Sequence, residues 1–425
     1  MLTENDEFSA AGIAEHQLVA WPRVAAVASM VAFSLPTFVT GLEVSHGLGA
    51  TDAMIALIAG SLIIFVIGAI MGSVGAKTRL SSYLLVRIAF GDRGAGVVNL
   101  AFAVSLLGWF GVNINLFTNA VERLAQSLFG VSIGPLWLSI VASVCMTVTT
   151  MIGFRAINLV STLLVPVLAV VTFLLAKSAL DAQSMSEILA TENTATLSVG
   201  DGVSAIVGAI IVGAIILPDI TRFSRHWSGA VYTAIIAYVI IQVAVMGAAS
   251  FAGIVSGKTD ILEIMLDVNL GFGAFAIVII GSWVLNSLNL YSAVLSTKAT
   301  IPRLNTVGLT IGLGAVGVIA AMMNILDQFV TFLFYLSVIF IPVAGVIVMD
   351  FLVIRPARYH ADTLIGNRPF SGKGFAAWAL GAVVALLASE GIIPALTTIA
   401  AIDAMAVSAV VYTLISWRDR KATTS

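Results

Sequence analysis

The stretch VAAVASMVAFSLPTFVTGLE, residues 24–43, is an apolar segment of membrane-spanning length with a proline in its interior. Pro36 removes a backbone donor and clashes with the preceding turn, so we expect the helix to break near Ser34. In a bilayer the carbonyl groups freed by such a break must find partners or line a cavity. The stretch therefore predicts an interrupted transmembrane helix.

A second apolar segment has the same character. Residues 205–224 read AIVGAIIVGAIILPDITRFS, with Gly208 and Gly213 in the apolar run and Pro218 near its end. Interrupted helices at matching positions in two halves of a chain are typical of secondary transporters, whose substrate site lies near the bilayer midplane. On the sequence alone, two proline kinks without function stay open as the alternative.

The composition of the whole chain agrees with a membrane location. Of its 425 residues, 60% are hydrophobic and only 10% are charged, and the mean hydropathy is +1.08. Soluble domains carry about 25% charged residues, so a soluble fold is excluded. The net charge of −2 gives no reason to expect a nucleic acid partner, and the single cysteine excludes a cysteine metal cluster. Since no HExxH, GxSxG or Cys/His set occurs, we expect neither enzymatic activity nor a cofactor.

Windows of about 20 apolar residues predict twelve transmembrane helices. With the N-terminus placed in the cytoplasm, 17 of the 20 lysine and arginine residues lie on the inner side, as the positive-inside rule requires. The even number of spans then places both termini in the cytoplasm. The two acidic outer loops are expected to hold short surface helices. The predicted spans start near residues 20, 53, 95, 132, 157, 203, 229, 274, 307, 328, 374 and 396.

The two interrupted spans are the first and the sixth, which predicts a five-plus-five inverted repeat. No segment outside the spans is long enough to fold as a soluble domain. We expect a cytoplasmic tail over residues 1–19, a first repeat over 20–180, a second repeat over 181–353, spans 11 and 12 over 354–416, and a cytoplasmic tail over 417–425.

The eighth span, GSWVLNSLNLYSAVLS at residues 281–296, carries two carboxamides. Ser282, Asn286 and Asn289 share one helical face, because residues three and four apart are neighbours. An Asn facing lipid would be costly, so these side chains must face protein or a wet cavity. Hydrogen bonding between helices is the simpler explanation. Two carboxamides opposite two broken helices favour ligand contact, more for Asn286 than for Asn289.

The third span contains SLLGWFGVNINLF at residues 105–117, in which Trp109 lies between two glycines near the middle of the span. An indole offers a stacking surface for a planar heterocycle, a contact worth about 1–3 kcal/mol for nucleic acid bases. A packed core aromatic is the alternative. Asn113 lies one turn further along the same face and is expected to line the outer path.

These motifs resemble those of nucleobase:cation symporter family 1, in particular its bacterial cytosine/purine permease branch. The resemblance implies an all-helical LeuT-type fold, with ten helices in two inverted repeats and two additional C-terminal helices, in the inner membrane. It also implies inward transport of a nucleobase or related heterocycle with Na⁺ or H⁺, and stacking of the base on Trp109. The stretches that carry it are residues 75–99, GWFGV at 108–112, PDITRFSR at 218–225 and WVLNSLNLYSA at 283–293.

The chain departs from the cytosine permeases where they contact the base. Leu106 stands where they have a glutamine, Ala209 and Ile210 where they have a Ser-Phe pair, and Gly281 where they have an asparagine. Most of the polar set that reads cytosine is therefore apolar here. We expect either a different base or recognition through Asn286, Asn289 and free main-chain groups near residues 34–37 and 208–210.

The sodium site of the family is also altered. Val284 and Leu285 stand where its hydroxyl pair would lie. Hard cations take about six oxygen ligands, and aliphatic side chains supply none. The sequence therefore favours H⁺ over Na⁺ as the coupling ion. Asp219, next to Pro218, is expected to pair with Arg222 or Arg225 in a structural role.

The sequence thus predicts a secondary active permease that imports a planar heterocycle by alternating access, with an uncoupled facilitator or channel as the alternative. The expected partners are the heterocycle and the lipid bilayer, and we expect a monomer. The candidate substrate-binding residues are Ser34, Pro36, Leu106, Trp109, Asn113, Gly208, Ala209, Ile210, Gly281, Asn286 and Asn289. The candidate ion-coupling residues are Ser34, Thr37, Glu43 and Ser282.

Overall fold

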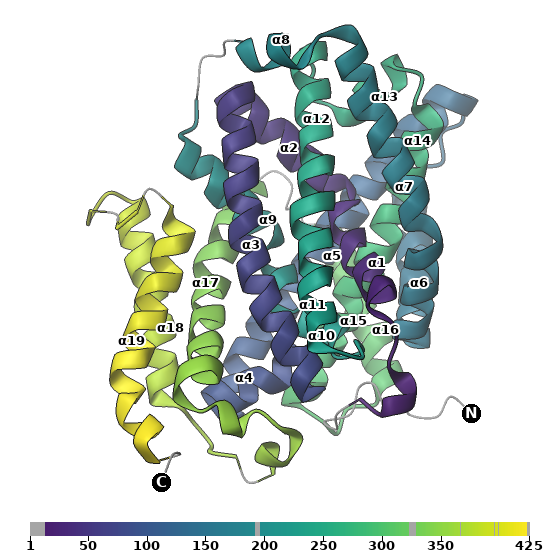
Figure 1. Ribbon diagram of the computed structural model, residues 1–425. Coiled ribbons are helices and arrows are strands. Elements are labelled where there is room, and N and C mark those ends of the chain that lie inside the picture. The colour runs from purple at the N-terminus through teal and green to yellow at the C-terminus, as the bar shows by residue number, and fades with distance from the viewer. Residues whose placement is uncertain are drawn as a thin grey trace.

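The computed structural model describes residues 13–191, 196–322, 329–365, 367–394, 396–397 and 399–422. The regular structure in these ranges is helical, with one isolated bridge between Val19 and Ser224. The long helices run side by side, and the first and last described residues lie at the same end of the bundle (Figure 1). Residues 1–12 and 423–425, which belong to the two predicted tails, lie outside the described part.

The number of membrane spans can be tested by helix length. Nine helices in the described part are long and apolar enough to cross a membrane, or ten when α1 (Trp21–Ala32) and α2 (Leu35–Leu48) count as one bent span. Two shorter apolar helices, Thr306–Ala321 and Val338–Ile354, fall where the ninth and tenth spans are predicted. A helix of 16 residues rises only about 24 Å, less than the hydrocarbon core, so length alone does not establish twelve spans.

The first half of the chain continues after α2 with the longest helices of the bundle. Gly49 and Gly91 have positive φ and separate consecutive helices at tight corners. Gly130 ends the 38-residue α5 in the same way. The helices are α3 (Ala50–Thr78), α4 (Ser82–Phe90), α5 (Asp92–Phe129), α6 (Pro135–Ile152) and α7 (Phe154–Ala182).

The second half has shorter, more interrupted helices. The two surface helices expected in the outer loops are confirmed as α8 (Met185–Ala190) and α13 (Ile261–Asp267). Three membrane helices of the described part contain π-helical turns, at Ile235–Ile241, Ile277–Gly281 and Asp350–Ile354. The others are α9 (Val199–Ile215), α10 (Pro218–Thr221), α11 (Trp227–Ala234), α12 (Gln242–Ser256), α14 (Gly271–Ala276), α15 (Ser282–Thr300), α16 (Thr306–Ala321), α17 (Phe329–Met349), α18 (Gly372–Ser389) and α19 (Ala400–Ala422).

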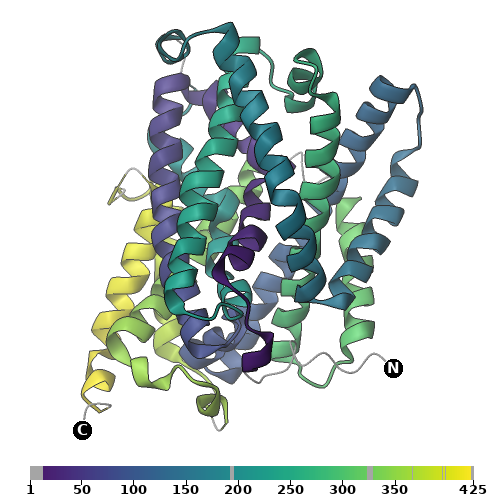
Figure 2. The same ribbon diagram turned by 45° about the vertical axis from the view of Figure 1, so that its right-hand side comes forward.

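The last two helices are peripheral. α18 and α19 pack on each other and on α17 at one edge of the bundle, whereas α6 lies at the opposite edge (Figure 2). The centre of the bundle is formed by α1, α2, α5, α9 and α15, which are therefore the elements that can enclose a site.

The predicted break in the first span is confirmed. α1 and α2 meet at an angle of 53°, and Ser34 between them has an extended backbone. The break leaves the Val31 carbonyl without its usual helical donor. The hydroxyls of Ser34 and Thr37 replace that donor, at 2.7 and 3.1 Å from the Val31 oxygen. Side-chain hydroxyls thus satisfy a carbonyl that the break between α1 and α2 left without its helical donor.

The sixth span differs from the expectation. α9 continues as regular helix to Ile215, and only a short turn at Ile216 and Leu217 separates it from α10. The expectation of free main-chain groups at residues 208–210 is wrong, because these residues lie inside α9 and their backbone groups belong to a regular helix. The irregularity falls where Pro218 removes a donor, about two helical turns later.

The helix α4 was not predicted from the sequence. This short helix is buried and follows α3 after a three-residue connection. The loop before α18 covers the end of α4: Asn367 Nδ2 donates to the Arg87 carbonyl and Arg368 Nη2 to the Ala89 carbonyl, both at 2.6 Å. The basic residues around α4 predicted that this segment lies on the cytoplasmic side. They did not predict a short helix packed against the end of the bundle.

Candidate functional site

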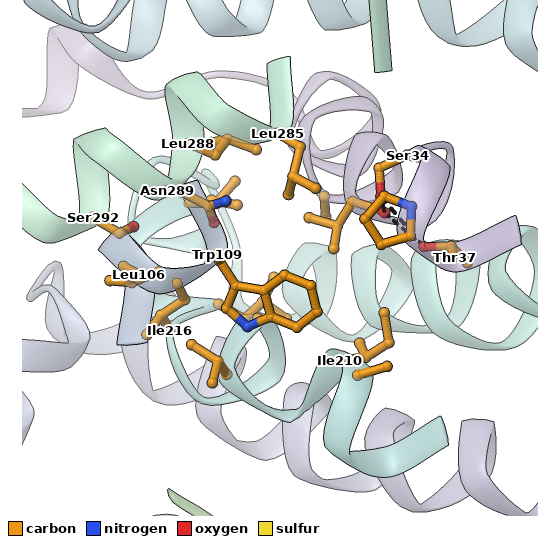
Figure 3. Close-up of a pocket in the computed structure, with 18 of the residues that line it drawn as sticks. Ser34, Thr37, Leu106, Trp109, Ile210, Ile216, Leu285, Leu288, Asn289 and Ser292 are labelled. Atoms are coloured by element: carbon orange, nitrogen blue, oxygen red, sulfur yellow. Dashed lines mark hydrogen bonds between the residues drawn. The ribbon is translucent and has the colours of Figure 1, made fainter. Parts of the chain in front are cut away.

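A cavity lies at the level of the break in the first span. It is lined by α1, α2, α5, α9 and α15, with Ile220 from α10 and Tyr238 from the π-helical turn before α12. In Figure 3, Trp109 projects from α5 into the middle of the lining side chains. The lining residues are Ala28, Val31, Ser34, Pro36, Thr37, Leu106, Trp109, Ala209, Ile210, Val212, Gly213, Ile216, Leu217, Ile220, Tyr238, Leu285, Leu288, Asn289 and Ser292.

The lining is apolar and uncharged. None of the described lining residues carries a formal charge, and most are aliphatic. An apolar pocket with a few placed polar groups is typical of a small-molecule site. An uncharged lining favours a neutral ligand, because a buried charge without a partner is costly. The side chains that bring polar atoms are those of Ser34, Thr37, Trp109, Tyr238, Asn289 and Ser292.

Trp109 lies where the sequence predicts it. Its side chain is 7% exposed, and it lines the cavity opposite the α15 residues (Figure 3). Gly111, two residues later, packs against α16, where an added Cβ would lie 2.8 Å from the Ala320 main-chain carbon. The small residue next to Trp109 thus lets α5 and α16 approach closely, which holds the indole at a fixed depth.

The two carboxamides of α15 have different positions. Asn286 is fully buried and donates from Nδ2 to the Phe110 main-chain oxygen at 3.1 Å. Asn289 lines the cavity and donates from Nδ2 to Asn286 Oδ1 at 3.3 Å. The structure therefore brings Asn289 to the cavity and places Asn286 behind it. This order is the reverse of the one that the sequence favoured.

The remaining substrate candidates divide into two groups. Ser34, Pro36, Leu106, Ala209 and Ile210 line the cavity as well. Asn113 and Gly208 are not among its lining residues, and Asn113 donates to the Trp109 carbonyl of its own helix at 2.8 Å. Gly281 also lies outside, packed against the Phe33 main-chain oxygen. The sequence reasoning missed Ser292, although it lies one turn beyond Asn289 and so on the same face.

Of the four ion-coupling candidates, the structure brings Ser34 and Thr37 together, with their hydroxyl oxygens 3.4 Å apart. Ser34 and Thr37 line the cavity, but both hydroxyls already bond to the Val31 carbonyl. Ser282 is fully buried outside the cavity lining, and Glu43 is exposed on α2. Among the described residues, no group of three or more His, Cys, Asp or Glu could hold a metal ion.

A buried polar network lies next to the cavity. The carboxylate of Asp219 accepts from the Ser82 backbone N–H at 2.9 Å, from the Ser82 hydroxyl at 2.6 Å and from the Ser292 hydroxyl at 3.0 Å. Arg222 donates from Nε to the Asp219 main-chain oxygen at 3.2 Å and from Nη2 to the Tyr291 hydroxyl at 2.8 Å. The network thus joins α4, α10 and α15, and Ser292 is its member at the cavity.

Comparison with known proteins places this site in a family. Residues 24–414 match the family described as permeases for cytosine/purines, uracil, thiamine and allantoin. The chain belongs to this family. The family resemblance read from the sequence motifs is thereby confirmed, and the protein is a multi-pass membrane permease. Its relatives are transporters, which also confirms the prediction that it is not an enzyme.

Individual relatives agree with this assignment. The cytosine permease of Escherichia coli strain K12 is 28% identical over 327 residues, which is 76% of each chain. Mhp1, a nucleobase-cation-symport-1 family transporter solved in a closed conformation with bromovinylhydantoin bound, has a TM-score of 0.82 at 18% identity, over 99% of this chain and 97% of its own. A Na⁺-coupled sialic acid symporter has a TM-score of 0.70 at 14% identity, over 97% and 92%. These structures show an all-helical fold of the Mhp1 and LeuT type.

Proposed function

We propose that this permease imports a neutral planar heterocycle, a nucleobase or a close relative, by alternating access. The observation that carries the proposal is the cavity itself: an indole and a carboxamide face an uncharged, apolar chamber beside a broken helix. The indole supplies a stacking surface and Asn289 supplies hydrogen bonds. The hydantoin held by Mhp1 and the cytosine named for the Escherichia coli relative are ligands of this kind, which supports the proposal.

We further propose that coupling is to H⁺ rather than Na⁺. The solved neighbours include a transporter of the nucleobase-cation-symport-1 family and a Na⁺-coupled symporter, so a coupling ion is expected. In this chain Val284 and Leu285 place aliphatic groups where a sodium site needs oxygen ligands. This lack of oxygen ligands supports the proton.

The proposed topology has twelve spans in the inner membrane, with both termini in the cytoplasm. The two short helices Thr306–Ala321 and Val338–Ile354 then serve as the ninth and tenth spans. The inverted repeats cover residues 20–180 and 181–353, and α18 and α19 stand outside them. Their position at one edge of the bundle supports this division (Figure 2).

A binding screen tests the substrate class. Purified protein is heated with purines, pyrimidines, hydantoins or allantoin, each with and without Na⁺. We expect at least one neutral planar heterocycle to raise the melting temperature, because a ligand at 100 times its Kd stabilises the folded state by about 2.7 kcal/mol. Na⁺ should not change the shift. Charged analogues of the same shape are the control, and a larger shift with these than with the neutral compounds would contradict the proposal.

An uptake assay in vesicles tests the coupling. We expect accumulation of the heterocycle against its gradient to stop when a proton ionophore collapses the proton gradient, and to continue when K⁺ replaces Na⁺. Equilibration without accumulation under every condition would instead identify the alternative, an uncoupled facilitator or channel. Accumulation that requires Na⁺ and resists the proton ionophore would show that the proposed ion is wrong.

A further inference from the structure

The hydrogen-bonding character of one cavity residue, Ser292, is set by a residue that lies outside the cavity lining. We propose that Asp219 is a positioning residue that fixes the Ser292 hydroxyl as a hydrogen-bond acceptor toward the ligand, so that the site selects a heterocycle with an N–H donor at this edge. The inference rests on the proposed function, because it concerns the same cavity. Beyond the proposed function, it assigns a role to a residue that does not itself line the cavity. It also specifies the chemical group that the ligand carries at the edge next to Ser292.

The geometry of Asp219 leaves little freedom. The residue is fully buried, and its Oδ1 accepts both the backbone N–H and the hydroxyl of Ser82. Its Oδ2 accepts the Ser292 hydroxyl at 3.0 Å. Ser292 lines the cavity, whereas Asp219 does not. The carboxylate therefore reaches the ligand only through Ser292.

The direction of the Ser292 hydrogen bond follows from counting hydrogens. A carboxylate can only accept, and a hydroxyl has one hydrogen and two lone pairs. Since the Ser292 hydrogen points to Asp219, the oxygen has only lone pairs left for the cavity. A ligand N–H can satisfy them, whereas a ligand carbonyl at the same place would face a second acceptor. A buried acceptor without a donor is costly, so the two ligand edges are distinguished.

The surroundings keep the carboxylate in this role. Three donors bond to Asp219, and the Arg222 guanidinium lies close enough to act on its charge. Arg222 is held in turn by the Tyr291 hydroxyl. A buried carboxylate is stable only with such partners. The other ionisable groups of this region are Tyr83, whose hydroxyl lies close to Asp219, Ser82 and Ser292, and Arg79, which bonds to the Arg222 main-chain oxygen.

A second chain of hydrogen bonds orients the Asn289 carboxamide so that its oxygen can accept from the ligand. The Phe110 carbonyl can only accept, so the Asn286 amide must turn Nδ2 toward it and Oδ1 toward Asn289. Asn289 then donates one of its two Nδ2 hydrogens to that oxygen, which leaves its own Oδ1 as an acceptor and its second Nδ2 hydrogen as a donor. Figure 3 shows Asn289 and Ser292 on the same side of the cavity. Two acceptors one helical turn apart favour a ligand edge with N–H groups.

The test compares bases that differ at one edge: the amine lies beside an unprotonated ring nitrogen, and the carbonyl lies beside a ring N–H. Cytosine and uracil, and adenine and hypoxanthine, carry an amine or a carbonyl at the same ring position. We expect the unmodified permease at mildly alkaline pH, where carboxyl groups are ionised, to bind the amine of each pair at least about 10-fold more tightly. Binding is measured by calorimetry on the purified full chain, and competition for uptake gives a second reading.

Two variants test the relay. In Asp219→Asn the amide nitrogen donates to Ser292, whose hydrogen then turns to the cavity, so the preference should fall to about 1 or reverse toward the carbonyl. In Ser292→Ala the acceptor is gone and the preference should also fall to about 1. A purely structural role for Asp219 would weaken both members of a pair equally and leave their ratio unchanged.

Each result decides the inference. An amine preference that survives in folded Asp219→Asn overturns it, and so does equal binding of both members by the unmodified permease. If Asp219→Asn does not fold, Ser292→Ala decides, because an unchanged ratio of the two affinities in that variant would also overturn the inference. If none of the four compounds binds, the inference fails, since both amines carry the required donor. The wider screen with hydantoins and allantoin then judges the proposed function separately.

Discussion

Replacement of Trp109 by alanine is expected to weaken binding of the heterocycle by about 5- to 150-fold, while the protein still inserts and folds. The range is the affinity equivalent of about 1–3 kcal/mol for one stacked base. The indole projects into the middle of the cavity, so its loss also leaves an apolar void where the ligand would have a partner. Binding is measured by calorimetry with the heterocycle that gives the largest shift in the screen.

Two further variants make this result specific. Trp109→Phe keeps an aromatic face and should recover part of the affinity. Trp137→Ala removes an indole that is 67% exposed on α6, outside the cavity lining, and should bind like the unmodified protein. Wild-type affinity in Trp109→Ala would show that the indole is a packed core residue and not a stacking surface.

Replacement of Gly281 by alanine is expected to destabilise the protein by about 1–3 kcal/mol and to abolish uptake. An added Cβ would lie 2.5 Å from the Phe33 main-chain oxygen and 3.4 Å from the Ser34 Cα. Both atoms belong to the backbone at the break between α1 and α2, so they cannot move aside as a side chain can. The new methyl group would push α15 away from the break, and Asn289 and Ser292 would move with it.

A glycine elsewhere provides the matched control. Gly312 lies in α16, and an added Cβ there would meet nothing within 4 Å. Gly312→Ala should therefore keep the melting temperature and the uptake rate of the unmodified protein. If Gly281→Ala behaves in the same way, the close approach of α15 to the first span is not required for transport.

The same glycine shows how sequence and structure complement each other. From the sequence, Gly281 appeared only as a position where the cytosine permeases have an asparagine. The structure shows that the Phe33 main-chain oxygen occupies the space that a side chain at residue 281 would need. The missing carboxamide is thus linked to a close helix contact, which no inspection of one segment at a time could reveal.

Local features were predictable because their causes are local. Pro36 lacks the backbone donor of a regular helix and follows Ser34 closely, so the bend between α1 and α2 was predicted from residues 24–43. The choice between Asn286 and Asn289 was not predictable, because residues three apart lie on one face and only the partner helix decides which of them is covered. The Phe110 carbonyl covers Asn286 and leaves Asn289 at the cavity.

By itself, the sequence determined that this chain spans a membrane, that its first span is interrupted, and that an indole lies at the depth of the break. Composition, proline and the residues flanking Trp109 are enough for these conclusions, because each acts within one helix. Only the tertiary structure decided which polar groups face the cavity and that Asp219 stands behind Ser292. These features depend on which helices meet, and hydrogen bonds between residues such as Ser82, Asp219 and Ser292 have no signature in the order of the chain.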